Sequence, residues 1–282
     1  MTLRSGEVFF SEQSESFLIP ESVSLFGFTI SFYGVCLVLA ALVGILVVTE
    51  ITRRKQYNTE LHLTLLTLTI VAALLGGRLF YLLFEWQAFA QHPLDVFNLR
   101  SGGLTYFGAL FGAWFAIRGY CRKKEAEFLL SADVLSLGVG AASPFVWAGC
   151  AFMREPLGKA YDGIFAVRIS GEYGTAGENA AYVSMHPVAI YGIVGSVLIF
   201  TVLCIISRKS KQTGNVFYGY LVLQAAEIFV LECFRADSYC IWGTDIPVNF
   251  VVAGVILLTI VVGWMRHTSL QSKLKKIRFN GN

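Results

Sequence analysis

The sequence predicts an all-α integral membrane protein with seven transmembrane helices and a small extracytoplasmic cap. Hydrophobic residues make up 55% of the 282 residues, and the mean hydropathy is +0.62. Soluble domains rarely have such a composition, whereas polytopic membrane proteins do. Apolar stretches of roughly twenty residues recur along the chain, which is the length that a helix needs to cross the hydrocarbon core.

These apolar stretches follow one another in a single polytopic domain, residues 1–282. In lipid, only a helix or a closed barrel satisfies its backbone hydrogen bonds, and stretches of this length indicate helices. The third stretch is the weakest, because Arg118 cuts it short. The expected spans are residues 23–49, 61–84, 103–119, 129–152, 184–206, 214–234 and 246–265.

Two segments outside the spans have a distinct composition. Residues 153–183 form a long loop that contains glycine, charged residues and, at 165–169, a short alternating piece typical of a strand. We expect this loop to form the cap. Residues 268–282 form a basic tail, which we expect to lie against the anionic inner leaflet.

Lysine and arginine residues predict the orientation of the chain. They gather after the first, third, fifth and seventh stretches, and the positive-inside rule places such clusters in the cytoplasm. The N-terminus is then outside and the C-terminus inside. The net charge of +3 is therefore no argument for nucleic-acid binding. The clustered residues are Arg53, Arg54, Lys55, Arg118, Arg122, Lys123, Lys124, Arg208, Lys209, Lys211, Arg266, Lys273, Lys275, Lys276 and Arg278.

In this orientation, several polar residues of the spans share one depth, in the outer half of the membrane. Ionisable groups buried in a bilayer are costly and usually functional. We therefore expect a working site that faces the extracytoplasmic side. The residues are Tyr33, Arg78, Tyr106, His186, Glu227, Glu232 and Arg235.

Arg78 lies too far from the cytoplasmic end of its stretch to reach water there. It needs a carboxylate partner or an anionic ligand. Glu227 and Glu232 lie at a compatible depth, so a structural ion pair and a phosphate-binding arginine are both open. Gly102 and Gly103, at a predicted helix start, would let backbone N–H groups approach an anion such as a phosphate.

The other candidate residues also have two interpretations. His186 is either a general base or an interfacial residue that caps the fifth helix. Glu232 and Arg235 are spaced to pair across one helical turn, which stabilises a helix end even without a catalytic role. Gly108 and Gly112 are typical of close helix packing. No set of His, Cys or Asp residues has the spacing of a metal site, and no cofactor is expected.

Six motifs occur in order between residues 23 and 265. They are SFYG (31–34), LGGRLFY (75–81), SGGLTYFGALFG (101–112), Gly149-Cys150 followed by Lys159, HPVAIY (186–191) and ECFRAD (232–237). Together they resemble the prolipoprotein diacylglyceryl transferase family, and a clostridial-type branch of it most of all.

The resemblance implies an enzyme of the bacterial plasma membrane that acts at the outer leaflet. It would move a diacylglyceryl group from phosphatidylglycerol to the lipobox cysteine thiol of a prolipoprotein signal peptide, and glycerol phosphate would leave. Such chemistry needs an electropositive site for the phosphate and a base for the thiol. From this resemblance we expect phosphatidylglycerol binding by Arg78, Gly102, Gly103 and Arg235, with Arg154 as a positive charge at a position of this chain's own. We expect proton transfer by His186 or by Tyr106, which lies beside the position at which many members have a histidine, and supporting roles for Tyr33, Glu155 and Glu232.

Three positions depart from the family pattern. Phe107 stands where many members have a histidine, and Trp147 and Ile228 stand where the family has arginines. One alternative is therefore a catalytically degenerate paralogue that binds lipid or lipoprotein signal sequences. Another is a small-solute transporter, although charges at a single depth argue against a continuous translocation path.

Overall fold

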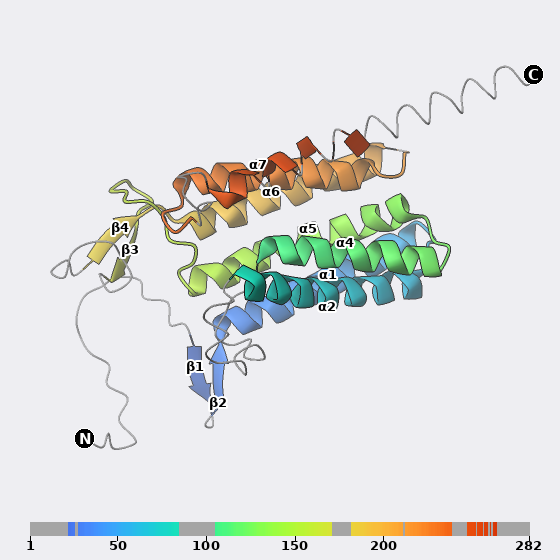
Figure 1. Cartoon of the computed structure of the whole chain (residues 1–282). Helices are drawn as coiled ribbons and strands as arrows, with labels where there is room; N and C mark the ends of the chain where they lie inside the picture. Colours follow the sequence, from blue (N-terminus) through green and yellow to red (C-terminus); the bar gives the residue numbers. More distant parts are fainter. Residues whose placement is uncertain are drawn as a thin grey trace, which may run out of the picture.

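The computed structural model describes residues 22–25, 28–84, 105–170, 182–210 and 212–238, together with most of 247–263. Long helices lie side by side, and two small β-hairpins lie at one end of this bundle (Figure 1). The helices are α1 (Phe32–Arg54), α2 (Thr59–Phe84), α4 (Tyr106–Lys123), α5 (Phe128–Phe152), α6 (Val188–Lys209) and α7 (Asn215–Phe234). The strands are β1 (Ser22–Leu25), β2 (Phe28–Ser31), β3 (Val167–Ser170) and β4 (Tyr182–Met185). The residues described between 248 and 263 are also helical.

Among the described residues, five helices are long and apolar enough to cross a membrane: α1, α2, α5, α6 and α7. Large apolar side chains such as Leu46, Leu75 and Leu198 are exposed on the outside of the bundle. Water would disfavour such a surface, whereas lipid chains solvate it. The expected membrane protein is confirmed. Helix α4 is not among the five, in agreement with the weakness of the third apolar stretch.

The first span begins later than predicted, at Phe32 instead of residue 23. The residues before it form the β1–β2 hairpin, in which Ser22 lies opposite Ser31 and Leu25 opposite Phe28. Apolar and polar residues alternate in Phe28–Ser31, which is the period of a strand. A count of apolar residues does not separate this alternation from the helix that follows, and that is why the prediction was wrong there.

Two more helix starts differ from the prediction for a local reason. Helix α6 begins at Val188 instead of residue 184, because Pro187 is its N-cap and the residues before it belong to β4. Helix α4 begins at Tyr106 instead of residue 103. Its N-cap Thr105 accepts a hydrogen bond from Gly108 N through the side chain, which satisfies a backbone donor of the first turn.

Helices α2 and α4 pack closely through their glycines, as predicted for Gly108 and Gly112. A Cβ atom on Gly108 would collide with the Gly76 carbonyl group, and one on Gly112 with the Ala72 carbonyl group. This contact confirms the small-residue face. It also brings Thr105 against α2, where both its backbone N and its hydroxyl group donate to Gly77 O, at 3.1 and 3.2 Å.

The basic helix ends lie together, at the opposite end of the bundle from the hairpins (Figure 1). There the Lys55 ammonium group donates to the Ser207 hydroxyl group at 3.3 Å and links the ends of α1 and α6. The Asp133 carboxylate accepts from the backbone N of Gly214 and Phe217, each at 2.7 Å. This capping contact joins α5 to the start of α7.

Candidate functional site

A short connecting segment, residues 157–160, follows α5 in the chain and lies between the end of α7 and the start of α6 at the hairpin end. It forms backbone hydrogen bonds with both. Gly158 forms an antiparallel bridge with Arg235, and Ala160 forms one with Met185. Lys159 contributes twice, since its backbone N donates to Phe234 O at 2.8 Å and its O accepts from His186 N at 3.0 Å. The segment therefore holds the Arg235 and His186 backbones on its two edges.

Gly158 makes this close approach possible. The residue is buried, and a Cβ atom built on it would collide with the backbone carbonyl group of His186. Any other residue would push the segment away from the start of α6. The structure thus gives a steric reason for glycine at position 158.

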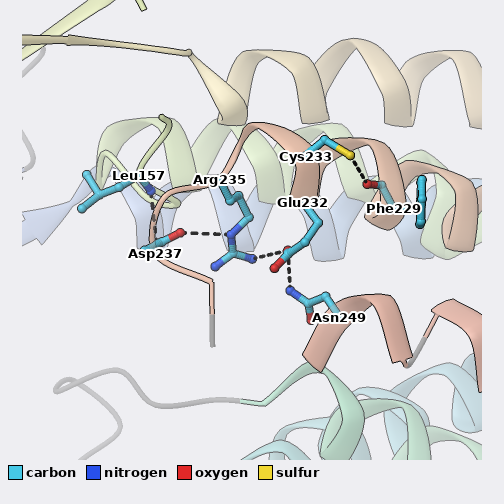
Figure 2. A network of polar contacts seen from close by, with 7 residues as sticks. All are labelled: Leu157, Phe229, Glu232, Cys233, Arg235, Asp237 and Asn249. Carbon is cyan, nitrogen blue, oxygen red and sulfur yellow. Dashed lines mark hydrogen bonds and ion pairs between the residues drawn. The ribbon is translucent and has the colours of Figure 1, made fainter. Parts of the chain in front are cut away.

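Arg235 lies between two carboxylates, as Figure 2 shows. Its Nε donates to Asp237 Oδ1 at 3.0 Å, and its Nη1 lies 3.7 Å from Glu232 Oε2. The other oxygen of Asp237 accepts from Leu157 N at 3.2 Å, and Asn249 Nδ2 donates to Glu232 Oε2 at 2.7 Å. The expected pair of Glu232 and Arg235 is present, and it belongs to a larger network.

The network combines a buried carboxylate with a partly exposed guanidinium group. The Glu232 side chain is 1% exposed and the Arg235 side chain 23%. Within the described residues, Glu232 Oε1 has no hydrogen-bond partner. A buried oxygen in this state is uncommon, because an unmet hydrogen bond is costly, and it can accept one more hydrogen bond.

His186 lies in an aromatic environment. Its ring stacks on Tyr161, with centroids 4.0 Å apart, and meets the edge of Phe234 at 5.0 Å. Its Nδ1 lies 3.2 Å from the Tyr191 hydroxyl group. When Nδ1 carries the proton and donates to that hydroxyl oxygen, Nε2 is the basic nitrogen. The interpretation of His186 as a helix cap is wrong, because the N-cap is Pro187 and no side chain caps the helix.

Tyr33 joins α1 to the end of α5. Its ring lies so close to Gly149 that a Cβ atom there would be 2.9 Å from Tyr33 Cδ2. Cys150, which the sequence singles out only as part of the Gly149-Cys150 motif, lies in the last turn of α5.

Arg154 and Glu155 directly follow α5. Arg154 has a φ of 56°, in the left-handed region, and its backbone N donates to Ala151 O at 3.2 Å. The Arg154 side chain is half-buried and the Glu155 side chain is exposed. Both residues therefore lie at the hairpin end, beside the connecting segment that reaches Arg235.

Arg78 is buried on α2, with its guanidinium group over the Tyr81 ring at 5.6 Å. Its neighbour Gly77 receives the two hydrogen bonds from Thr105 at the start of α4. Glu227 and Glu232, the two candidate partners of Arg78, have hydrogen bonds and ion pairs with other residues. Glu227 accepts from Gln224 Nε2 at 2.8 Å, and Glu232 pairs with Arg235 and Asn249.

Some predicted site residues fall outside the description. Tyr106 is the first residue of α4, but the positions of its side chain and of the Phe107 side chain are not described. Gly102 and Gly103 lie outside the described residues altogether. Among the residues that are described, no group of three or more His, Cys, Asp or Glu side chains could hold a metal ion.

Comparison with known proteins gives the family. The family model for prolipoprotein diacylglyceryl transferases matches residues 20–266. This chain belongs to that family. The match spans every helix of the bundle and the whole hairpin end, so Tyr33, Glu155, His186, Glu232 and Arg235 all lie within it.

Three relatives show how far the similarity extends. The Finegoldia magna protein is 25% identical over 83% of this chain and 92% of its own length. The Clostridioides difficile protein is 27% identical over 89% and 95%, and the Symbiobacterium thermophilum protein is 28% identical over 91% and 96%. Each is named phosphatidylglycerol–prolipoprotein diacylglyceryl transferase. The resemblance to this family, clostridial members included, is confirmed.

Two of the three departures from the family pattern occupy defined places in the bundle. The Trp147 indole of α5 lies directly on Gly192 of α6, where a Cβ atom would collide with its ring. Ile228 is half-buried on α7, one helical turn before Glu232. Trp147 therefore fills the contact between α5 and α6, and Ile228 puts an apolar side chain one turn from the Glu232 carboxylate.

Proposed function

We propose that this protein transfers a diacylglyceryl group from phosphatidylglycerol to the lipobox cysteine thiol of a prolipoprotein, at the outer leaflet of the bacterial plasma membrane. The observation that carries the proposal is the convergence of Tyr33, Glu155, His186, Glu232 and Arg235 on the hairpin end of a bundle that belongs to this family. The relatives carry the same activity in their names.

The proposal includes a topology of seven spans, with the N-terminus outside and the C-terminus inside. The basic ends of α1, α4 and α6 lie away from the candidate site, and the positive-inside rule assigns such ends to the cytoplasm. The site and the 153–183 cap then face the extracytoplasmic side. The basic tail, 268–282, would be cytoplasmic.

In the proposed reaction, the cysteine sulfur attacks the diacylglycerol carbon that carries the phosphate ester. A carbon–sulfur bond forms as the carbon–oxygen bond breaks, and glycerol phosphate leaves with the electron pair. The thiol proton passes to a base, for which His186 and Tyr106 are the candidates. Positive groups near the leaving phosphate stabilise the charge that develops in the transition state.

The phosphate site would use Arg235 together with Arg78 and Arg154, and the backbone N–H groups of Gly102 and Gly103. Arg235 carries one positive charge and lies between the carboxylates of Glu232 and Asp237. These three side chains together are therefore not electropositive. A phosphate oxygen could replace the exposed Asp237 as the partner of Nε, while buried Glu232 continues to orient the guanidinium group. Tyr33 and Glu155 would support the site from α1 and the connection after α5.

Direct transfer is the test. Purified protein is reconstituted with phosphatidylglycerol and a lipobox peptide, and mass spectrometry measures addition of a diacylglyceryl group. A peptide with alanine in place of the lipobox cysteine is the control. We expect a mass gain on the thiol peptide only. If folded protein binds phosphatidylglycerol but modifies neither peptide, the catalytically degenerate binding paralogue becomes the better description.

A further inference from the structure

One turn of the cap exposes two large apolar side chains. Ala166 N donates to Gly163 O at 3.0 Å, which closes a turn with Ile164 and Phe165 at its tip. Ile164 is 97% exposed and Phe165 73%, more than any other large apolar residue in the described part of the chain. Such tips are usually Gly, Pro, Asn, Asp or Ser, so this pair is not explained by the turn itself.

The turn lies close to the level at which α6 begins. Tyr161 N donates to Ser184 O at 2.9 Å, and the Tyr161 ring stacks on His186, next to the N-cap of α6. Ile164 is three residues further, so its Cα lies within roughly 11 Å of that of Tyr161. The headgroup layer on each side of a bilayer is about 5–8 Å thick. The tip is thus within reach of lipid headgroups and the adjoining acyl chains.

Exposed apolar side chains also occur on the segments that adjoin this turn and at the neighbouring helix ends. Met153 is exposed just after α5, Val167 is exposed at the start of β3, and Ile190 is exposed in the first turn of α6. Exposed apolar side chains are therefore present both in the cap and at the adjoining helix ends. A soluble protein rarely presents such a surface to water without a partner.

We propose that the turn Gly163–Ala166 inserts Ile164 and Phe165 into the interfacial region of the same membrane that holds the helices, and so anchors the cap over the site. Phenylalanine and aliphatic side chains of membrane-surface segments insert at the boundary between headgroups and acyl chains. The membrane is the expected occupant, because it is present at all times and covers the tip between turnovers. An apolar segment of a peptide substrate would leave the tip in water whenever the site is empty. The proposal requires membrane residence only, and it stands whether or not the protein is a transferase.

Tryptophan fluorescence in lipid vesicles tests this contact. The full-length variants Phe165→Trp and Asp162→Trp are reconstituted in phosphatidylethanolamine–phosphatidylglycerol vesicles, with or without bromine atoms on the acyl chains near the headgroups. Subtraction of the wild-type signal removes the native tryptophans. Asp162 is an exposed polar residue just before the turn and is the matched control. We expect blue-shifted emission that brominated lipid quenches at position 165, and red-shifted emission with much weaker quenching at position 162.

Three results would overturn the proposal. Emission at position 165 typical of water, without quenching, would leave the tip in solvent. Equal quenching at both positions would show that the tip has no special contact with lipid. A change at position 165 only after a lipobox peptide is added would make the peptide, and not the membrane, the occupant. A double variant, Ile164→Ser with Phe165→Ser, provides a second measurement. It should weaken the contact between the cap and the vesicle surface. We expect faster proteolysis of residues 153–170 than in the wild type, while the helices stay protected.

Discussion

Glu232 and Arg235 lie 3.7 Å apart at the end of α7, and the carboxylate is almost completely buried while the guanidinium group is partly exposed. Asn249 fixes the same carboxylate oxygen from the helical segment that follows α7 (Figure 2). Buried Glu232 orients the partly exposed Arg235, whose Nε can donate to an anionic ligand in place of the exposed Asp237. The predictions below test this arrangement and the segments that hold it.

Two replacements of Arg235 distinguish the effect of its charge from the effect of its planar guanidinium geometry. Arg235→Ala removes the cation beside a buried carboxylate, and we expect transfer to be lost and the free energy of unfolding to fall by about 1–3 kcal/mol. Arg235→Lys keeps the charge but cannot reach both Glu232 and Asp237 in one plane, so it should remain folded with weaker phosphatidylglycerol binding. Transfer assays and thermal unfolding in detergent measure the two effects. Full activity of the lysine variant would show that the planar geometry is not needed.

Gly158 is expected to tolerate no side chain. Gly158→Ala would press a methyl group against the His186 carbonyl group and separate the connecting segment from α6. We expect strongly reduced activity and a lower melting temperature. Gly119→Ala on α4 is the matched control, because no atom lies within 4 Å of a Cβ there, and alanine in a helix should stabilise by about 0.5–1 kcal/mol. Similar behaviour of the two variants would contradict this steric explanation.

The Tyr191 hydroxyl group should help His186 to act as a base. Tyr191→Phe keeps the aromatic packing with Phe234 but removes the contact with His186 Nδ1. A hydrogen bond worth about 0.5–1.5 kcal/mol corresponds to a loss of roughly 2–12-fold in kcat. His186→Ala should cost far more. If both variants retain wild-type kcat, Tyr106 becomes the remaining candidate for the base.

An arginine in place of Ile228 should improve the site. Position 228 is one turn before Glu232, whose Oε1 has no hydrogen-bond partner among the described residues. Ile228→Arg could pair with this oxygen and add positive charge near the phosphate. We expect kcat/KM for phosphatidylglycerol to rise by about tenfold or more.

The control for that gain is the neighbouring residue. Phe229 is exposed on the outside of α7, so Phe229→Arg would put a charge into lipid and should lower stability without raising activity. A gain with both variants would indicate a general effect of charge. A folded Ile228→Arg variant without any gain would show that the lost arginine is not what limits this site.

The helix bounds were predictable where composition alone decides the structure. Helices α2, α5 and α7 begin and end within two residues of the predicted stretches, because burial in lipid requires a continuous apolar run and a helical backbone. The prediction was wrong at Phe32 and Val188, where strand-forming residues or a proline precede the helix. These boundaries depend on hydrogen bonds to a partner strand, which an apolar run does not reveal.

The sequence by itself determined the family and the class of helical membrane protein, because motif identity and hydrophobicity are local properties of the chain, and the candidate site residues stay predictions from those motifs. Only the tertiary structure decided what those residues contact. Three contacts join segments far apart in the chain. Gly158 forms a bridge with Arg235, His186 stacks on Tyr161, and Trp147 packs on Gly192. Their physical basis is close packing between helices and across the connecting segment, which sequence spacing does not encode.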